Sequence, residues 1–250
     1  MKILGIDVGG SGIKGAIVDT KKGVLLTERH RIETPQPATP NAVIQTITKL
    51  IKHFDWHGQV GVGFPAAVVD EVVRTASNID DSWIGVNAAY KIEKVTGCPT
   101  HLVNDVDAAG FAEMKFGAGM NEKGIVLIAA FGTGIGTAIF HKKKLLPNTE
   151  LGHVYMDNGM KGEHYAANSV REKNELSFEE WGKRVNEYLS YLEKLFYPNL
   201  IIIGGGVSKK FDQFEAYLDL DTPVVPAKNR NHAGIIGAAL AAKNEHLRKV

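Results

Sequence analysis

A glycine-rich turn with one hydroxyl residue occurs twice in the chain, each time between two apolar runs. This pattern predicts a β-hairpin whose turn exposes backbone N–H groups, a geometry that suits an anion. Two such hairpins facing each other across a cleft would hold a chain of phosphates from both sides. The turn residues are Gly9, Gly10, Ser11 and Gly12 in the first copy and Gly132, Thr133 and Gly134 in the second.

The first copy carries charged residues that the second copy lacks. Asp7 stands at the end of the first apolar run, where a carboxylate can hold Mg²⁺, usually through water. Lys14 follows the first turn, whereas the corresponding residue of the second copy is Gly136. A duplication that became asymmetric in this way indicates that one half took on a charge-bearing role.

The first turn also satisfies the dinucleotide-binding fingerprint GxGxxG, from Gly10 to Gly15. That fingerprint requires a helix after the glycines, whereas residues 16–19 continue as a strand. We therefore reject a Rossmann fold. The chain contains no GxxxxGK[ST] motif either, which excludes a P-loop. Taken alone, each glycine turn is about as well explained by a tight hairpin without a ligand.

A third glycine-rich segment, residues 204–206, lies between the apolar run 200–203 and a predicted helix. One interpretation is a flexible connection between strand and helix. The other is close approach of a ligand to the backbone, with a phosphate at the N-terminus of the helix. We favour the second interpretation because three consecutive glycines lose much backbone entropy on folding. The donor-site candidates here are Gly205, Gly206 and Lys209.

Polar residues follow the ends of predicted strands. Asn104 and Asp105 come directly after the apolar run that ends at Val103. Asp105 would be a good helix N-cap, and capping alone is the more common role for such a residue. However, the carboxyl ends of strands in α/β folds face the ligand crevice, which favours a functional role. Further polar candidates, in loops that the repeat would bring near the cleft, are Asn78, Glu150 and His153.

The composition excludes several classes of protein. The chain is 44% hydrophobic and 23% charged, and its net charge of +1 gives no support for non-specific binding to nucleic acid or to an acidic membrane. Cys98 is the single cysteine, which rules out an internal disulfide and a multi-cysteine zinc site. Met1-Lys2 leads directly into a strand, without a signal peptide or a transmembrane run, so we expect a cytoplasmic protein.

The two halves of the chain show similar patterns of elements. Each half has three strands followed by alternating helices and strands, which predicts a duplicated α/β fold with two domains around a central cleft. We expect the first domain at 1–108 and the second at 109–232, with the C-terminal segment 233–250 packing back on the first domain as a helix. The predicted strands lie within 2–33 and 124–146 (three each) and at 59–64, 100–104, 200–203 and 222–226.

Together these motifs closely resemble those of the ROK family of sugar kinases, and the resemblance covers almost the whole chain. It implies the ribonuclease-H/actin/hexokinase fold and a homodimer. The segments that carry it are Asp7–Lys14, Gly61–Pro65, Asn104-Asp105, Gly132–Gly134, Glu150–His153 and Gly204–Gly206.

One departure from the family pattern narrows the resemblance. Most ROK members follow the Glu-x-Gly-His motif with a Cys-x-Cys-Gly-x-x-Gly-Cys zinc loop. Residues 156–163 replace that loop here and contain no cysteine, so the family's zinc is not carried over. The segments 167–181, 192–196 and 225–237 look like those of the zinc-free polyphosphate glucokinases within the family.

The resemblance implies transfer of the terminal phosphoryl group of inorganic polyphosphate to the 6-hydroxyl of glucose, with Mg²⁺ near Asp7 and Asp105 as the general base. It leaves open whether ATP is also a donor. The implied glucose ligands are Asn78, Asn104, Asp105, Glu150, His153 and Glu163. The implied donor ligands are Asp7, Gly9, Gly10, Ser11, Gly12, Lys14, Gly132, Thr133, Gly134, Gly205, Gly206 and Lys209.

Several other functions share parts of this pattern. An ATP-dependent ROK hexokinase would act on glucose or mannose. A sugar-sensing ROK repressor carries an N-terminal helix-turn-helix domain, for which we expect no room before the strand that starts at Lys2. An actin-fold ATPase chaperone would not need the polar residues at Asn104-Asp105, and an exopolyphosphatase would use water in place of glucose. Assays of glucose 6-phosphate formation and of phosphate release separate these alternatives.

Overall fold

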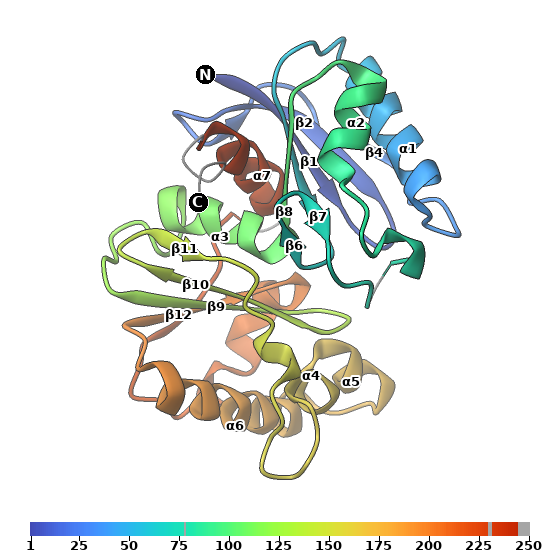
Figure 1. Cartoon of the computed structure of the whole chain (residues 1–250). Coiled ribbons are helices and arrows are strands. Elements are labelled where there is room, and N and C mark those ends of the chain that lie inside the picture. The colour runs from blue at the N-terminus through green and yellow to red at the C-terminus, as the bar shows by residue number, and fades with distance from the viewer. Residues whose placement is uncertain (78, 230–231, 245–250) are drawn as a thin grey trace. The chain divides into compact units, whose positions relative to one another are not determined.

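The computed structural model describes residues 1–77, 79–229 and 232–244. The chain divides into two compact units (Figure 1). Unit 1 comprises Met1–Ala112 together with Asn231–Val250, and unit 2 comprises Glu113–Arg230. The chain passes from unit 1 to unit 2 within helix α3 (Asp105–Phe116), the helix that also contains the predicted boundary at 108/109.

Unit 1 contains a six-stranded sheet in which an antiparallel hairpin adjoins two parallel strands. Strand β1 pairs antiparallel with β2 and parallel with β5, and β5 pairs parallel with β8. The order is β3-β2-β1-β5-β8, with β4 also paired to β2. Nearly every residue of β1, β5 and β8 is buried, as expected for strands covered on both faces. The strands are β1 (Lys2–Val8), β2 (Ile13–Asp19), β3 (Val24–Leu25), β4 (His30–Ile32), β5 (Val60–Phe64) and β8 (Thr100–Asn104).

The sequence predicts three strands within residues 2–33, and the structure has four. A bend at Leu26-Thr27 divides the third predicted strand into the short strands β3 and β4. The consequence for the site is that β4 lies beside β2, with Arg31 opposite Lys14.

The helices of unit 1 start and stop at recognisable signals. Helix α1 (Pro40–His53) has proline at its first position and buries an apolar face, while α2 (Ala88–Thr96) ends at Gly97 in the left-handed conformation. The Asn87 side chain caps α2 by accepting from the N–H of Tyr90. The remaining small elements of unit 1 are β6 (Val68–Val69), β7 (Val72–Val73) and the 3₁₀ helix η1 (Asp81–Trp83).

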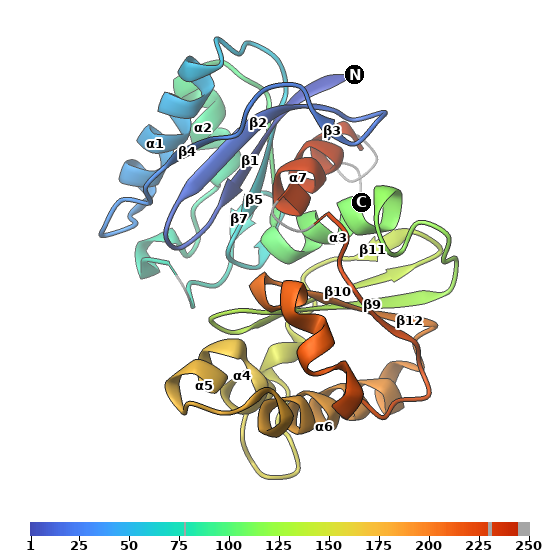
Figure 2. The ribbon, with the colours of Figure 1, turned by 180° about the vertical axis from the view of Figure 1, so that it is seen from behind.

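The C-terminal helix α7 (Ala233–Lys243) packs against the sheet of unit 1, as Figure 2 shows. Two strand glycines make this close packing possible. A Cβ atom on Gly5 would lie 2.1 Å from the carbonyl oxygen of Ile235, and one on Gly61 would lie 1.9 Å from that of Ala238. The helix, predicted within the segment 233–250, ends at Lys243, and residues 245–250 lie outside the described part of the chain.

Unit 2 repeats the strand arrangement of unit 1. Its five-stranded sheet has the order β11-β10-β9-β12-β13, in which β9 and β10 form an antiparallel hairpin and β12 lies parallel to both β9 and β13. The repetition of hairpin plus parallel strands confirms the predicted duplicated α/β class. The strands are β9 (Ile125–Phe131), β10 (Ile135–His141), β11 (Lys144–Leu146), β12 (Leu200–Gly204) and β13 (Val224–Pro226).

One long helix covers much of the core of unit 2. Helix α6 (Phe178–Phe196) begins with a capping box, in which Ser177 and Glu180 satisfy each other's backbone N–H groups. Its buried face carries Trp181, and residues 185–192 continue that face. The other helices are η2 (Leu151–His153), α4 (Gly162–Ala166), α5 (Asn168–Lys173), η3 (Gly206–Gln213) and η4 (Glu215–Tyr217).

The helix predicted after residues 204–206 is a 3₁₀ helix, η3, rather than an α-helix, and its backbone departs from helical geometry at Lys210. In a 3₁₀ helix residues three apart lie on the same face. Phe211, within η3, and Phe214, directly after it, both turn into the core of unit 2 with ring centroids 5.3 Å apart. None of the helices in the described part of the chain has the length and apolar character needed to cross a membrane.

Candidate active site

The turn of unit 1 joins β1 to β2, and hydrogen bonds from neighbouring groups hold several of its carbonyl groups. The N–H of Gly9 donates to the carbonyl of Gly12 across 3.2 Å. The Thr34 hydroxyl donates to the Gly9 carbonyl, and the Arg31 guanidinium donates to the Ser11 carbonyl, each across 2.5 Å. The middle of the turn, Gly10 and Ser11, is exposed.

Asp7 and Lys14 face each other where this hairpin begins and ends. The Asp7 Oδ2 atom lies 3.7 Å from the Lys14 Nζ atom, and the two side chains are 22% and 28% exposed. Burial raises the pKa of the Asp7 carboxyl, and the charges of Lys14 and Arg29 counteract part of that rise. Helix α7 adds to the burial, because a Cβ on Gly234 would lie 2.9 Å from the Asp7 carboxyl carbon.

This carboxylate can be tested as a Mg²⁺ ligand. Mg²⁺ in phosphoryl-transfer sites keeps several waters and uses one or two carboxylates together with substrate phosphates. A single, partly exposed carboxylate next to an anion-binding turn fits that pattern. Within the described ranges, no group of three or more His, Cys, Asp or Glu side chains lies close enough to form a cage for a metal.

Asn104 and Asp105 stand at the end of β8 and the start of α3, as predicted, but their local roles differ from the prediction. Asn104 Oδ1 accepts from the N–H groups of Val106 and Asp107 at 2.8 and 3.0 Å, so Asn104 is the principal cap. Its Nδ2 donates to the carbonyl of Ala66 at 3.2 Å. Asp105 accepts only the adjacent Val106 N–H among these groups, at 2.9 Å. The amide oxygen is placed better for the second donor because it stands one residue earlier.

The turn of unit 2 joins β9 to β10, and hydrogen bonds likewise hold its carbonyl groups. The N–H of Gly132 donates to the carbonyl of Gly134 at 2.9 Å. Ser169 of α5 makes two contacts: its N–H donates to the Gly132 carbonyl at 3.0 Å and its hydroxyl donates to the Thr133 carbonyl at 2.5 Å. The structure therefore adds Ser169 to the residues that shape this turn, a residue that no sequence motif indicated.

Three predicted sugar ligands gather close to this turn. His153 Nε2 lies 3.2 Å from Glu163 Oε1. The other oxygen of Glu163 lies beside Gly134, since a Cβ atom on that glycine would come within 2.4 Å of it. Burial raises the pKa of the Glu150 carboxyl; His153 lowers it and the negative charge of Glu163 raises it further. Unit 2 thus brings Glu150, His153 and Glu163 together as one acid–imidazole cluster.

The chain around Glu150 is fixed to strand β10. Thr137 donates its hydroxyl to the carbonyl of Thr149, and the same hydroxyl accepts from the N–H of Leu151 at 3.1 Å. Gly152 must be glycine for this approach, since its Cβ would lie 2.2 Å from the Ile135 carbonyl oxygen. The Glu-x-Gly-His motif therefore needs its glycine for contact with the strand.

The predicted segment at 204–206 also meets the end of β9. Gly205 has a φ of 79°, and a Cβ on it would lie 2.4 Å from the Phe131 carbonyl oxygen. The Ser208 hydroxyl donates back to the Gly205 carbonyl at 2.8 Å. Gly206 and Lys209 are exposed beyond this contact.

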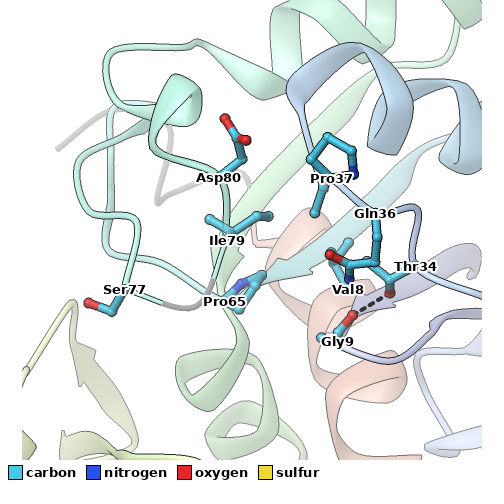
Figure 3. Close-up of a pocket in the computed structure, with 11 residues that line it drawn as sticks. Val8, Gly9, Thr34, Gln36, Pro37, Pro65, Ser77, Ile79 and Asp80 are labelled. Atoms are coloured by element: carbon cyan, nitrogen blue, oxygen red, sulfur yellow. Dashed lines mark hydrogen bonds between the residues drawn. The ribbon is translucent and has the colours of Figure 1, made fainter.

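Unit 1 contains a cavity of about 300 Å³ next to its glycine turn, shown in Figure 3. Gly9, Gly10 and Pro65 were singled out in the sequence, whereas Thr34 and Gln36 were not. Asn78 lies outside the described residues. The full lining consists of Val8, Gly9, Gly10, Thr34, Gln36, Pro37, Ala38, Pro65, Ser77, Ile79 and Asp80.

The structure therefore assembles the predicted residues into two sets. Unit 1 holds the paired charges of Asp7 and Lys14, the first turn and the Asn104-Asp105 strand end. Unit 2 holds the second turn, the cluster around Glu163 and the Gly205 loop. In each unit a glycine turn therefore lies close to a carboxylate side chain, Asp7 in unit 1 and Glu163 in unit 2.

Comparison with known proteins identifies the family of this chain. The model of the ROK family matches residues 3–166, and this chain belongs to the ROK family.

Two of the similar proteins are named for polyphosphate. The chain is 49% identical to a polyphosphate glucokinase of Mycobacterium tuberculosis over 239 residues, covering 95% of this chain and 90% of the relative. The crystal structure of an inorganic polyphosphate/ATP-glucomannokinase from Arthrobacter sp. strain KM superposes with a TM-score of 0.93 at 44% identity, covering 98% of this chain and 99% of that one. A xylose repressor of Bacillus spizizenii is 26% identical over 168 residues, covering 63% of this chain and 44% of the repressor. The predicted family and fold are thereby confirmed.

Proposed function

We propose that this chain transfers the terminal phosphoryl group of inorganic polyphosphate to the 6-hydroxyl of glucose, which yields glucose 6-phosphate. The observation that carries the proposal is 49% identity over 95% of the chain with a polyphosphate glucokinase. The polyphosphate/ATP-glucomannokinase, which covers almost the whole chain, supports the same reaction. Phosphoryl transfer asks a protein mainly for positioning and charge stabilisation, and the two sets of residues described above supply both.

Asp105 is proposed as the general base. It is half-buried at the carboxyl end of β8, where strand ends of α/β folds carry ligand-binding groups. As glucose O6 attacks the terminal phosphorus, the Asp105 carboxylate accepts the hydroxyl proton. Asn104 holds the start of α3 through its amide oxygen, and its amide nitrogen has a second hydrogen for a sugar hydroxyl.

The glucose ligands in unit 2 are proposed to be Glu150, His153 and Glu163, because they form one cluster beside the turn at Gly134. Carboxylates accept hydrogen bonds from sugar hydroxyls and orient the hydroxyl that reacts. Asn78 completes the proposed set from the resemblance alone. An Asn78→Ala variant with an unchanged glucose KM would remove it from that set.

The donor phosphates are proposed to bind the N–H groups of both turns and of Gly205-Gly206, with Lys14 adding positive charge. Mg²⁺ is proposed as the cofactor, held by Asp7, and it neutralises charge on the donor oxygens when bound. Activity that persists at full rate in EDTA without added divalent metal would contradict this role. Zinc is not proposed as a requirement, and elemental analysis of active protein tests that.

The trailing phosphates of a long donor are proposed to follow exposed cations. Lys209 and Lys228 are exposed in unit 2, and the third candidate, Arg230, lies outside the described residues. Removing one of these charges should raise the KM of long chains more than that of short ones, because only long chains reach it. Equal losses for short and long donors at all three positions would place the path elsewhere.

Two further properties complete the proposal. The resemblance to the ROK family supports a homodimer, which size-exclusion chromatography with light scattering tests. The composition supports a cytoplasmic location, which fractionation of cells that produce the protein tests.

The decisive experiment compares glucose 6-phosphate formation from polyphosphate and from ATP at equal phosphate concentration. We expect polyphosphate to support turnover. A second candidate, an ATP-dependent hexokinase for glucose or mannose, is favoured by the ATP and mannose in the name of the Arthrobacter enzyme. Turnover with ATP alone would select that candidate. Phosphate release that needs no glucose would indicate a polyphosphatase, and sugar binding without turnover would indicate a sensor like the xylose repressor.

A further inference from the structure

Ser169 holds two consecutive carbonyl groups of the turn in unit 2. Its backbone N–H donates to Gly132 and its hydroxyl donates to Thr133, at 3.0 and 2.5 Å. The residue stands 36 positions further along the chain, in helix α5. A single serine therefore fixes two neighbouring peptide groups.

Because the peptide bond is planar, these two hydrogen bonds also fix the direction of the N–H groups that belong to the same peptides. In a trans peptide the C=O of one residue and the N–H of the next lie in one plane and point in opposite directions. The carbonyls of Gly132 and Thr133 point at Ser169, so the N–H groups of Thr133 and Gly134 point away from it. In the described part of the chain neither N–H group donates a hydrogen bond. Ser169 thus leaves two unpaired donors aimed together from an exposed turn.

We propose that Ser169 is a positioning residue for phosphoryl transfer, which presents the N–H groups of Thr133 and Gly134 to the oxygens of the donor phosphate. This role rests on the proposed function of the chain. Backbone donors that are oriented before the substrate arrives stabilise charge without a reorganisation cost at the moment of reaction. Both of these contacts of Ser169 are with the backbone of the turn.

Ser169 is rigid enough for this role because its own segment is anchored. The indole N–H of Trp181 donates to the carbonyl of Ala166 at 2.9 Å and lies 3.3 Å from that of Ala167. Trp181 is fully buried on helix α6. Just after Ser169, the Arg171 guanidinium donates to the Asn168 side chain at 3.0 Å, closing the first turn of α5. The serine is therefore held between the core of unit 2 and the glycine turn.

In unit 1, side chains of other types hold the carbonyl groups of the glycine turn. Thr34 and Arg31 hold the carbonyls of Gly9 and Ser11, which by the same geometry directs the N–H groups of Gly10 and Gly12 away from them. Since the two units use different residue types from different elements, the common result is the orientation of the turn. This independent occurrence supports a role beyond local packing.

The test is Ser169→Ala, which removes the hydroxyl and keeps the backbone contact. We expect the KM for polyphosphate to rise roughly 3- to 10-fold, the effect of losing one hydrogen bond, while the KM for glucose changes less than about twofold. Binding of sodium tripolyphosphate, measured by calorimetry, should weaken by a similar factor. Ser169→Thr keeps a hydroxyl and should restore tripolyphosphate binding to within about twofold of the wild type.

Thr48→Ala is the matched control, because it removes a half-buried hydroxyl that also donates to a backbone carbonyl, that of Ile44, within helix α1. It should leave both substrates unaffected. Equal effects of Ser169→Ala on glucose and on polyphosphate, or unchanged tripolyphosphate binding, would overturn the positioning role. Wild-type protein that binds tripolyphosphate but makes no glucose 6-phosphate would instead refute the proposed function, and the binding of the variant would still decide the role of Ser169.

Discussion

The two glycine turns of this molecule differ more than their sequences suggest. The turn of unit 1 has four residues between paired Val8 and Ile13, whereas that of unit 2 has three between paired Phe131 and Ile135. The residue that replaces Gly9 in the second copy is Phe131, whose ring is buried against Trp181 with centroids 5.7 Å apart. The second turn is therefore one residue shorter than the first, because Phe131 belongs to the paired strand and its side chain fills the core of unit 2.

The charges around the two turns differ as well. The positive charges of Lys14 and Arg29 act on the Asp7 carboxyl, and the Arg31 guanidinium donates to the Ser11 carbonyl of the first turn. Beside Gly134 of the second turn lies an acid, Glu163. Under the proposed function, the duplicated turn serves two tasks: the first turn would carry compensating charge for the phosphates, and the second would offer oriented backbone dipoles next to the proposed acceptor ligands.

The largest expected effect lies in unit 1, at Asp105, the proposed proton acceptor. Asp105→Asn should lower turnover about 10²- to 10⁴-fold, because the amide cannot take the proton of the attacking hydroxyl. Steady-state turnover with saturating glucose and polyphosphate measures this, and calorimetry should show glucose binding close to that of the wild type. A variant that keeps more than roughly a third of wild-type turnover would remove Asp105 from the base role.

The next largest effect tests whether the positive charge that attracts the donor is confined to the first turn. Lys14→Met should lower kcat/KM for polyphosphate roughly 10- to 100-fold, the usual loss for a hydrogen bond to a charged group. The control is Lys144→Met on β11 of unit 2, an exposed lysine that should cost less than about twofold. Similar losses for both lysines would mean that overall positive charge, rather than the first turn, attracts the donor.

The glycines of the second turn provide a sharper contrast. A Cβ on Gly134 would displace the Glu163 carboxylate, whereas a Cβ on Gly132 meets nothing within 4 Å. Gly134→Ala should therefore raise the KM for glucose about 3- to 10-fold, and Gly132→Ala should change it less than about twofold. Glucose kinetics at saturating polyphosphate measure both. Equal effects of the two alanines would separate Glu163 from glucose binding.

The smallest effect concerns stability at the charged turn. Burial raises the folded-state pKa of Asp7 above its ordinary value of 3.8, so the contribution of this group to stability is complete below that value and is lost as the pH rises through the folded pKa. Asp7→Asn removes the buried charge and should raise the Tm by about 1–4 °C at pH 7, with the gain vanishing towards pH 3–4.

Asp19→Asn is a control for which we expect the opposite change in Tm. Backbone N–H bonds from Lys21 and Lys22 lower the pKa of its carboxyl, so Asp19→Asn should lower the Tm at pH 7. Thermal melts over pH 4–8 measure both variants. A lower Tm for Asp7→Asn at pH 7 would show that the pair with Lys14 outweighs the burial of Asp7.

Local signals in the sequence predicted much of the fold. The strand pattern, the capping box at Ser177 and the glycine turns follow from neighbouring residues, and the structure contains all of them. The residues that hold the turns could not be predicted, because Arg31, Thr34 and Ser169 act on residues 20, 25 and 36 positions away. Their side chains match no motif, and only the folded backbone brings them to a carbonyl. Asn104 was interpreted as a sugar ligand alone, although its position also suits a cap.

Helix α7 has a consequence for how the protein is made. The face of the unit 1 sheet against which α7 packs is completed by residues 233–243, and Gly5 and Gly61 leave room only for that helix backbone. Unit 2 is one continuous stretch, 113–230, whereas unit 1 needs residues 233–243 from beyond that stretch. Unit 1 therefore keeps an uncovered apolar face until residues 233–243, which follow the whole of unit 2 in the sequence, have been made. Loss of the final helix would leave that face open for aggregation.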